Sequence, residues 1–189
     1  IPDKGDIRLE GESVLNSWKY RNTINYLPQI ANFPANLTVK ELIKMVKNLR
    51  PKAAHDSDLI HLFDLEQFLD KKLGNLSGGT KQKVNIVLTF MFESDLIILD
   101  EPTAHLDVQH KIETFRLLKK IAHELNRAIL ISTHEIQLAT QIADTLWLMT
   151  DENIISGKPS ELIESDQINL LFDSNSIHFD KESNQFIMQ

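Results

Sequence analysis

Cysteine and long apolar runs are both missing from this sequence, and each absence excludes a class of protein. A chain without cysteine forms no disulfide, no thiolate metal site and no cysteine nucleophile. The longest apolar stretches, Val84–Phe92 and Leu96–Leu99, are far shorter than the roughly 18–20 residues that cross a bilayer. We therefore expect any membrane contact to go through a partner.

Positive charge is also scarce. The chain has 20 Lys and Arg residues against 27 Asp and Glu, which leaves a formal net charge of -7. A surface of this sign does not attract the phosphates of nucleic acid, so we expect no nucleic-acid partner. At 189 residues we expect one domain, or one domain with a small subdomain.

Hydrophobic periodicity and turn residues divide the chain into four parts. In order, they predict short strands with turns, amphipathic helices, apolar runs alternating with helices, and a short helix followed by a hairpin. The bounds of these parts are residues 1–28, 29–92, 93–150 and 151–189.

Two features of the second part can be predicted in more detail. Thr38 and Glu41 predict a capping box at the start of one helix, and Ser77 starts another. Between these helices, the apolar residues from Leu59 to Leu69 predict a single amphipathic piece.

Three short apolar runs in the third part are separated by longer amphipathic stretches. The runs are Leu96–Leu99, Ala128–Ser132 and Thr145–Met149. Apolar strands that alternate with helices indicate a parallel sheet covered on both faces, so the expected fold class is α/β. Ligands of such a sheet bind at the carboxyl ends of its strands.

Two adjacent carboxylates, Asp100 and Glu101, follow the first of these runs. They therefore lie at a strand end, where a ligand site is expected. Asp100 can hold Mg²⁺ through its water shell, and Glu101 can orient or deprotonate a water that attacks a phosphate. The alternative interpretation is a strand end that carries charge only for solubility.

A serine and two glycines open the helix that starts at Ser77. Ser77 can cap this helix, and Gly78 and Gly79 let backbone N–H groups approach an anion at the positive end of the helix dipole. A plain cap after a turn is the alternative. The overlapping segment Gly74–Lys81 resembles a P-loop with its last two residues exchanged, but no buried strand precedes it, so we reject that reading.

One histidine, His134, comes directly after the run that ends at Ser132. A histidine at this sheet edge can contact a γ-phosphate or hold the attacking water, and a local hydrogen bond is the alternative role. Other histidines, His110 among them, show no metal-ligand pairing, and we expect them to be surface or local residues.

Five segments occur in the order and approximate spacing of known motifs. They are Gln29 with the preceding Tyr26–Pro28, then Leu76–Thr80, Leu96–Glu101, Ala104–Asp107 and Ser132–His134. In this arrangement the chain resembles, over nearly its whole length, the ATP-binding subunits of ABC transporters. The resemblance implies a P-loop NTPase (RecA-like) fold, in which a parallel sheet core carries an inserted α-helical subdomain.

By this resemblance the four parts are the remainder of an N-terminal β part, the helical subdomain, the RecA-like core, and a C-terminal helix with a hairpin. Glu101 and His134 are the implied catalytic residues, and ATP and Mg²⁺ are the implied cofactors. The other implied roles belong to the Mg²⁺ ligands Asp100 and Gln29, the D-loop residue Asp107, and the signature residues Ser77, Gly78 and Gly79, which contact ATP.

The resemblance also implies partners. In such proteins two ATPase subunits pack head to tail, and the signature motif of one closes over the ATP of the other. ATP hydrolysis then drives transmembrane permease subunits, which places the chain in the cytoplasm, peripheral on the inner face of the cell membrane. Phe33, Pro34 and Leu37, beside Gln29, are candidates for the permease contact, and local packing is the alternative for them.

Two departures from the family pattern stand out. No G-x-x-x-x-G-K-[ST] motif occurs, and the chain begins with Ile1 rather than Met. We therefore expect the N-terminal strand and P-loop to precede Ile1, and we expect this chain alone neither to bind ATP tightly nor to hydrolyse it. His105 stands where a D-loop usually has a small residue.

Two segments of the sequence indicate different transported substrates. The segment from Ser132 to the C-terminus resembles ATPases of iron-complex and cobalamin importers, whereas the segment from Pro34 to Val84 resembles those of exporter-type (ABC-2) or copper-maturation permeases. We favour import of an iron chelate, with an exporter-type ATPase or a catalytically incomplete regulatory subunit as alternatives. A DNA-repair or chromosome ATPase would need a coiled coil between Gln29 and Ser77, and the spacing is too short for one.

Overall fold

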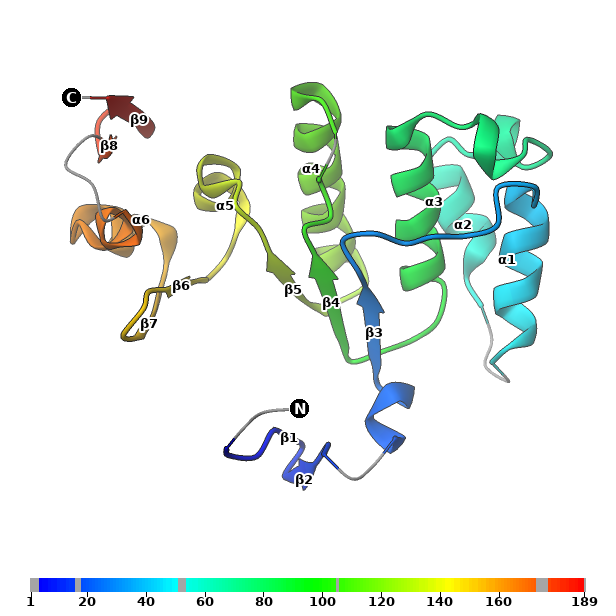
Figure 1. Ribbon diagram of the computed structural model, residues 1–189, viewed down its shortest axis with the longest axis horizontal. Coiled ribbons are helices and arrows are strands. Elements are labelled where there is room, and N and C mark those ends of the chain that lie inside the picture. Colours follow the sequence, from blue (N-terminus) through cyan, green and yellow to red (C-terminus); the bar gives the residue numbers. More distant parts are fainter. Residues whose placement is uncertain (1–3, 16–17, 51–53, 105, 173–176, 189) are drawn as a thin grey trace. The chain divides into compact units, whose positions relative to one another are not determined.

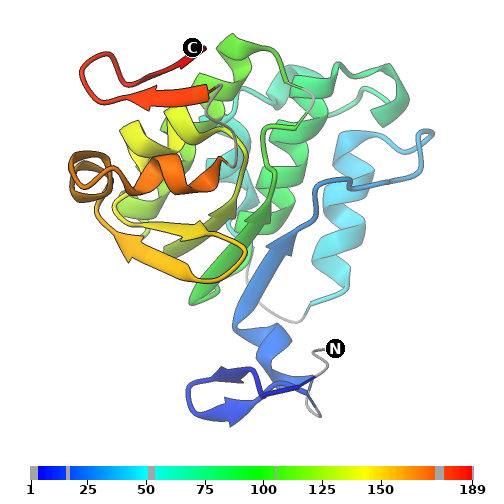
Figure 2. The same cartoon turned by 60° about the vertical axis from the view of Figure 1, so that its left-hand side comes forward.

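The computed structural model describes residues 4–15, 18–50, 54–104, 106–172 and 177–188. Contacts within the chain divide it into two compact units, residues 1–132 and 133–189. Figures 1 and 2 show the elements of both units from two directions. Each unit is described separately below.

The first unit alternates strands and helices. Its strands are β1 (Arg8–Leu9), β2 (Glu12–Ser13), β3 (Ile24–Leu27), β4 (Leu96–Asp100) and β5 (Ala128–Ser132). Its α-helices are α1 (Val39–Asn48), α2 (Asp56–Leu62), α3 (Gly78–Phe90) and α4 (Val108–Glu124). Three short 3₁₀ helices complete it, η1 (Lys19–Asn22), η2 (Glu66–Phe68) and η3 (Leu73–Asn75).

A parallel sheet in the order β3-β4-β5 forms the centre of this unit, and Figure 1 shows β3 and β4 running in the same direction. Leu27 pairs with Leu99, and Asp100 pairs with Ser132. Because the strands are parallel, their carboxyl ends meet at one edge of the sheet. The α/β fold class and the strands expected at Leu96–Leu99 and Ala128–Ser132 are thus confirmed.

The helices form the apolar core with this sheet. α3 packs against β3, and α1 and α2 pack against α3. The predicted capping box at Thr38 and Glu41 is present at the start of α1. A single amphipathic piece from Leu59 to Leu69 was expected, and this prediction is wrong: α2 ends at Leu62, and the chain reverses through Asp64, which has φ +54°.

The reversal at Asp64 has a packing reason. Phe63 and Leu65 flank it, and both are almost completely buried, at 1% and 0% exposure. A continuous helix would separate residues two apart by roughly 200° around its axis, so only one of them could face the core. The turn lets both enter the same cluster.

The second unit consists of two antiparallel hairpins and short helices. Its elements are α5 (Ile136–Ile142), β6 (Leu146–Met149), β7 (Ile154–Gly157), α6 (Pro159–Glu164), η4 (Gln167–Leu171), β8 (Ile177–Asp180) and β9 (Gln185–Met188). The predicted short helix and C-terminal hairpin are confirmed as α6 and β8–β9. A small apolar core of its own contains Leu148, Leu162, Ile168 and Phe179.

The run Thr145–Met149 was expected in the parallel sheet, and this expectation is wrong. Its strand, β6, pairs antiparallel with β7. The loop of residues 150–153 explains the difference, because so short a connection can join only antiparallel neighbours, whereas parallel strands need a long crossover.

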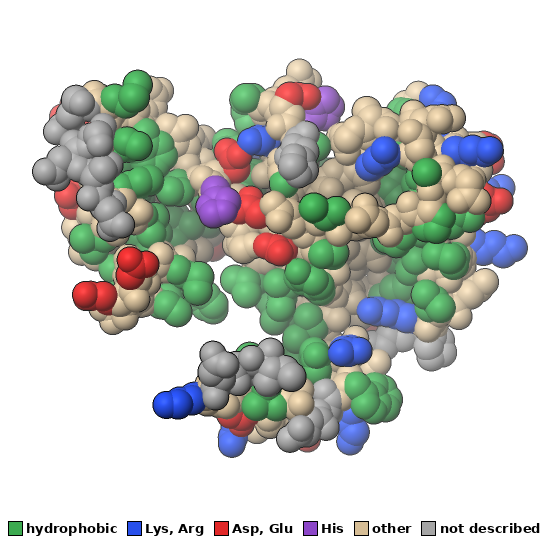
Figure 3. All heavy atoms as spheres, viewed as in Figure 1, with side chains coloured by type: hydrophobic (Ala, Val, Ile, Leu, Met, Phe, Trp, Pro, Cys, Tyr) green, Lys and Arg blue, Asp and Glu red, His purple; other side chains and the backbone are tan. Residues whose placement is uncertain are grey.

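The surface carries mixed charge on the face shown in Figure 3, where Lys and Arg side chains are spread among acidic and apolar ones over the helical region. Within the described ranges, no helix is both long enough and apolar enough to cross a membrane.

Candidate nucleotide site

The sheet brings several of the predicted residues to one edge. Asp100 is the last residue of β4, Ser132 is the last of β5 and pairs with it, and Gln29 follows the end of β3 by two residues. Gln29 is exposed, whereas Asp100 and Glu101 are half-buried. The edge therefore presents an amide and two carboxylates, as the strand pattern indicated.

Asp100 is held by one hydroxyl on each carboxylate oxygen. The Tyr26 hydroxyl donates to Oδ2 at 3.3 Å, and Ser132 Oγ donates to Oδ1 at 2.6 Å. Partial burial of the Tyr26 hydroxyl, followed by the charge and hydrogen bond of Asp100, raises the pKa of Tyr26 above its ordinary value. The neighbouring strands thus fix the orientation of this carboxylate.

The roles of Tyr26 and Ser132 were missed from the sequence. Both residues lie inside the segments already singled out, Tyr26 three positions before Gln29 and Ser132 two before His134. Only the strand order, which puts β3 and β5 on either side of β4, shows that both reach Asp100.

Glu101 has a left-handed backbone, with φ +45°. Its N–H donates to the carbonyl of Ser132, and its carbonyl accepts from the N–H of Ala104, both at 3.0 Å. A residue with a side chain adopts this conformation only when its surroundings hold it there. The two bonds turn the chain sharply where β4 ends, and the next two residues, Pro102 and Thr103, are buried.

The residues at this edge fit Mg²⁺. Carboxylate and amide oxygens, such as those of Asp100 and Gln29, are hard ligands of the kind that Mg²⁺ prefers. No group of three or more His, Cys, Asp or Glu suited to a metal occurs in the described part of the chain. This donor set suits an ion that takes one or two ligands from the protein and the rest from phosphates and water.

The signature segment forms the start of α3. Ser77 is the N-cap, and its Oγ accepts from the N–H of Thr80 at 3.2 Å. No hydrogen bond of the Gly78 or Gly79 N–H is found among the described residues. Two backbone donors at the positive end of a 13-residue helix can therefore bind a phosphate.

Asp107 is the N-cap of α4. Its Oδ1 accepts from the N–H of His110 at 3.0 Å, and its Oδ2 lies 2.6 Å from His110 Nδ1. These backbone and side-chain hydrogen bonds lower the pKa of Asp107. His110 also lies against Gly79 of α3, a contact that sequence reasoning did not foresee.

His134 belongs to the second unit, where it is exposed and its carbonyl accepts from the N–H of Ile136 at 3.0 Å. Its role beside Glu101 therefore stays a prediction. His105, the unusual D-loop residue, lies outside the described residues.

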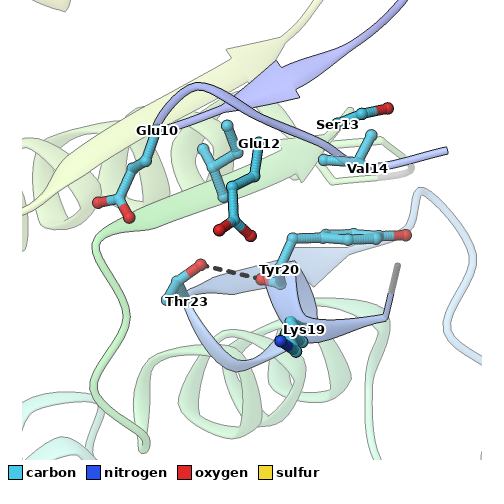
Figure 4. A pocket seen from close by; sticks show the side chains of 8 residues that line it. Glu10, Glu12, Ser13, Val14, Lys19, Tyr20 and Thr23 are labelled. Carbon is cyan, nitrogen blue, oxygen red and sulfur yellow. Dashed lines mark hydrogen bonds between the residues drawn. The ribbon is translucent and has the colours of Figure 1, made fainter. Parts of the chain in front are cut away.

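A separate hollow of about 170 Å³ lies between the β1–β2 hairpin and η1 (Figure 4). Glu10 and Glu12 project from the hairpin, and Lys19 and Tyr20 come from η1. None of the predicted site residues lines it. Because its two carboxylates repel phosphate, the hollow is unsuited to a nucleotide.

These features define a class of protein. A parallel α/β sheet with an Asp-Glu pair at a strand end agrees with the core of a P-loop NTPase domain, and the glycine-started helix α3 agrees with a signature segment rather than with a P-loop. Residues 1–104 match the family described as ABC transporter. The chain belongs to this family, and it is an ATPase whose hydrolysis of ATP is coupled to transport.

Relatives and a solved structure agree with this assignment. The chain is 31% identical to the probable siderophore transport system ATP-binding protein YusV of Bacillus subtilis, an alignment that covers 92% of this chain and 68% of YusV. It is 29% identical to the petrobactin import ATP-binding protein YclP of the same organism, over 90% of this chain and 72% of YclP.

The structure of cbiO1 from Clostridium perfringens, part of the ABC transporter complex cbiONQ, is similar with a TM-score of 0.73. It is 26% identical, and the match covers 89% of this chain and 73% of cbiO1. The relatives are ATP-binding components of transporters, so the partners of this chain include membrane permease subunits. The expected α/β P-loop NTPase fold and the ABC ATPase activity expected of the complete protein are thus confirmed, whereas the inactivity expected of this chain by itself stays a prediction.

Proposed function

We propose that this chain is the ATP-binding subunit of an importer for an iron chelate and works on the inner face of the cell membrane. One observation carries the choice of substrate class: two relatives that align with at least 90% of the chain are described as a siderophore transport protein and a petrobactin import protein. The resemblance of the segment after Ser132 to iron-complex importers supports the same choice.

Within the site, each predicted residue has a proposed role. Asp100, oriented by Tyr26 and Ser132, and Gln29 would hold Mg²⁺, which when bound neutralises charge on the β- and γ-phosphates. Glu101 accepts a proton from the attacking water, and its rigid backbone supports that task because a positioned base needs a fixed direction.

His134 is the proposed contact for the γ-phosphate. An exposed imidazole can donate a hydrogen bond to a phosphate oxygen or hold the attacking water, and His134 follows the last residue of β5 by two positions in the sequence.

The signature residues are proposed to act across a head-to-tail dimer. Ser77 and Gly78 are exposed, and the N–H groups of Gly78 and Gly79 are directed into no partner among the described residues. Donors left open on a surface suit a phosphate that a second copy of the chain brings to them. Asp107, exposed at the start of α4, would lie in the same interface.

The proposed permease contact is a hollow of about 350 Å³ beside Gln29. Tyr26 and Ile30, at 57% and 62% exposure, line it together with Phe33. Exposed apolar side chains around a hollow suit a docking protein segment. Pro34 and Leu37 do not line it, and Leu37 packs against the core instead.

Transport in proteoliposomes tests the substrate class. The vesicles contain the complete ATPase protein assembled with its permease, and uptake of radioactive iron is measured with ferric petrobactin and ATP. We expect ATP-dependent uptake that stops in Glu101→Gln, because that variant lacks the base. ATP turnover accompanied by export of the chelate, or by no movement of it, would contradict import of an iron chelate.

A further inference from the structure

His110 has its ring orientation fixed by Asp107. Nδ1 of the imidazole lies 2.6 Å from Oδ2 of Asp107, and the backbone N–H of His110 donates to Oδ1 of the same carboxylate at 3.0 Å. Because a carboxylate only accepts, Nδ1 carries the proton of the first hydrogen bond. The backbone bond holds the carboxylate in place, and the bond from Nδ1 directs the ring toward it.

The same ring covers Gly79. A Cβ atom placed on Gly79 would lie 3.1 Å from Cδ2 and 3.4 Å from Nε2 of His110. The first of these separations is closer than ordinary van der Waals contact, so the imidazole occupies the space that a side chain at position 79 would need. His110 therefore touches a signature glycine with one side of its ring and Asp107 with the other.

A hydrogen bond joins the same two segments about one turn further along α3. Gln82 Nε2 donates to the carbonyl of Pro102 at 2.6 Å, and Pro102 directly follows Glu101. The segment between β4 and α4 is thus fastened to the first turns of α3 near both of its ends. Two contacts between these segments restrict their movement relative to each other.

We propose that His110 is a positioning residue that couples Asp107 to the signature residues, so that both reach the nucleotide of the opposite subunit as one rigid piece. This inference rests on the proposed roles of Asp107 and Ser77–Gly79 in the dimer. His110 itself contacts no nucleotide in this proposal. Its loss impairs closure of the dimer around ATP rather than the grip of each subunit on its own ATP.

Three substitutions separate the two contacts of the ring. His110→Ala removes both, His110→Asn keeps a donor near Nδ1 for Asp107 but removes the ring from Gly79, and His110→Phe keeps a ring over Gly79 without the donor. His123→Ala is the matched control, because His123 is an exposed histidine on the same helix. Equal thermal midpoints confirm that all variants fold.

The first measurement is hydrogen exchange without nucleotide, which tests the coupling itself. We expect His110→Ala to speed exchange of the hydrogen-bonded amides of Thr80–Gln82 by about tenfold or more, with smaller changes in His110→Asn and His110→Phe. His123→Ala leaves exchange unchanged. If His110→Ala exchanges like His123→Ala, the ring does not hold α3 and the inference is wrong.

The second measurement is ATP turnover of the ATPase assembled with its permease. We expect kcat of His110→Ala to fall about tenfold or more while KM for ATP changes less than about twofold, and the ATP-bound dimer of Glu101→Gln to dissociate faster. Unchanged kcat and dimer lifetime would overturn the inference. Failure of Glu101→Gln alone to retain ATP would instead contradict the proposed function, and the exchange experiment would still decide whether His110 couples the segments.

Discussion

Helices α1 and α3 both begin at a hydroxyl cap, but they use the N–H groups of their first turns in opposite ways. In α1, Val39 and Lys40 donate to the carbonyls of Lys71 and Leu69, at 3.2 and 2.9 Å. The N–H of Glu41 donates to Thr38, and the Glu41 carboxylate accepts from the N–H of Thr38 at 2.8 Å. Every donor at the start of α1 is thus taken by the chain itself.

In α3 only the third N–H of the first turn is capped, because Thr80 donates to Ser77. The first two residues are glycines, and within the described part of the chain their N–H groups bond to nothing. The first turn contains no carboxylate. The helix start is therefore closed by the chain itself in α1, whereas in α3 it leaves two N–H groups without a partner among the described residues, as the proposed anion site requires.

The largest expected effect is that of Glu101→Gln on ATP turnover, and this variant should also trap ATP against the start of α3. In the complete protein, we expect Glu101→Gln to lower ATP turnover by about 10²–10⁴-fold, because the proposed general base is lost, and to hold the ATP-bound dimer together. In that dimer, ATP should slow hydrogen exchange at Gly78 and Gly79 but leave Val39 and Lys40 unchanged. Equal protection of both helix starts would break the comparison, and normal turnover would remove Glu101 from its role.

The next largest effect on ATP turnover is expected when a carboxylate is introduced into the first turn of α3, and the same change in the first turn of α1 is the comparison. We expect Gly78→Asp to reduce ATP turnover by about 10²–10³-fold, because its charge repels phosphate where donors are needed. Gly78→Asn, of the same shape without the charge, should retain at least about tenfold more activity than Gly78→Asp. Lys40→Asp puts the charge at the start of α1, and steady-state turnover like that of the unsubstituted protein is expected there.

The smallest effect is the response of the two caps to acid. The backbone and side-chain hydrogen bonds from Thr38 lower the pKa of Glu41 below its usual 4.5. A lowered pKa in the folded state means that this stabilisation is present above pH 4.5 and is lost as the pH falls through the folded value. The Ser77 cap of α3 carries no charge and should not titrate.

Amide protection followed by NMR between about pH 5 and pH 3 measures this difference. Protection in the first turn of α1 should decrease relative to that in α3, and Glu41→Gln should abolish the decrease. A parallel decrease in both helices would show that general acid unfolding, rather than the titration of Glu41, is being observed.

Local patterns predicted the elements near the site well. The cap at Thr38, the helix at Ser77 and the strand before Asp100 follow from neighbouring residues, and all three are present. Sequence patterns gave wrong predictions where side-chain packing or the length of a connection decides the local structure. The turn at Asp64 serves the burial of residues on both sides of it, and β6 pairs antiparallel because its loop is short.

The residues of the candidate site also differ in whether the sequence alone identifies them. Residue type and order in the sequence are enough to identify Asp100, Glu101 and the signature glycines. Tyr26 and His110 do not, because their contacts with Asp100 and Gly79 join residues that are far apart along the chain. The local periodicity of a sequence does not predict a contact of this kind.

The sequence by itself determined the family, the fold class and the residues at the strand ends, because each depends on short segments whose residue types and order are specific. Tertiary structure alone decided which hydroxyls orient Asp100, why Glu101 is held with a left-handed backbone, and which helix start has donors that meet no partner in the described part of the chain. The physical reason is that hydrogen bonds between segments depend on strand order and helix packing. The absence of cysteine and of long apolar runs excluded whole classes of protein, but it does not determine these hydrogen bonds between segments.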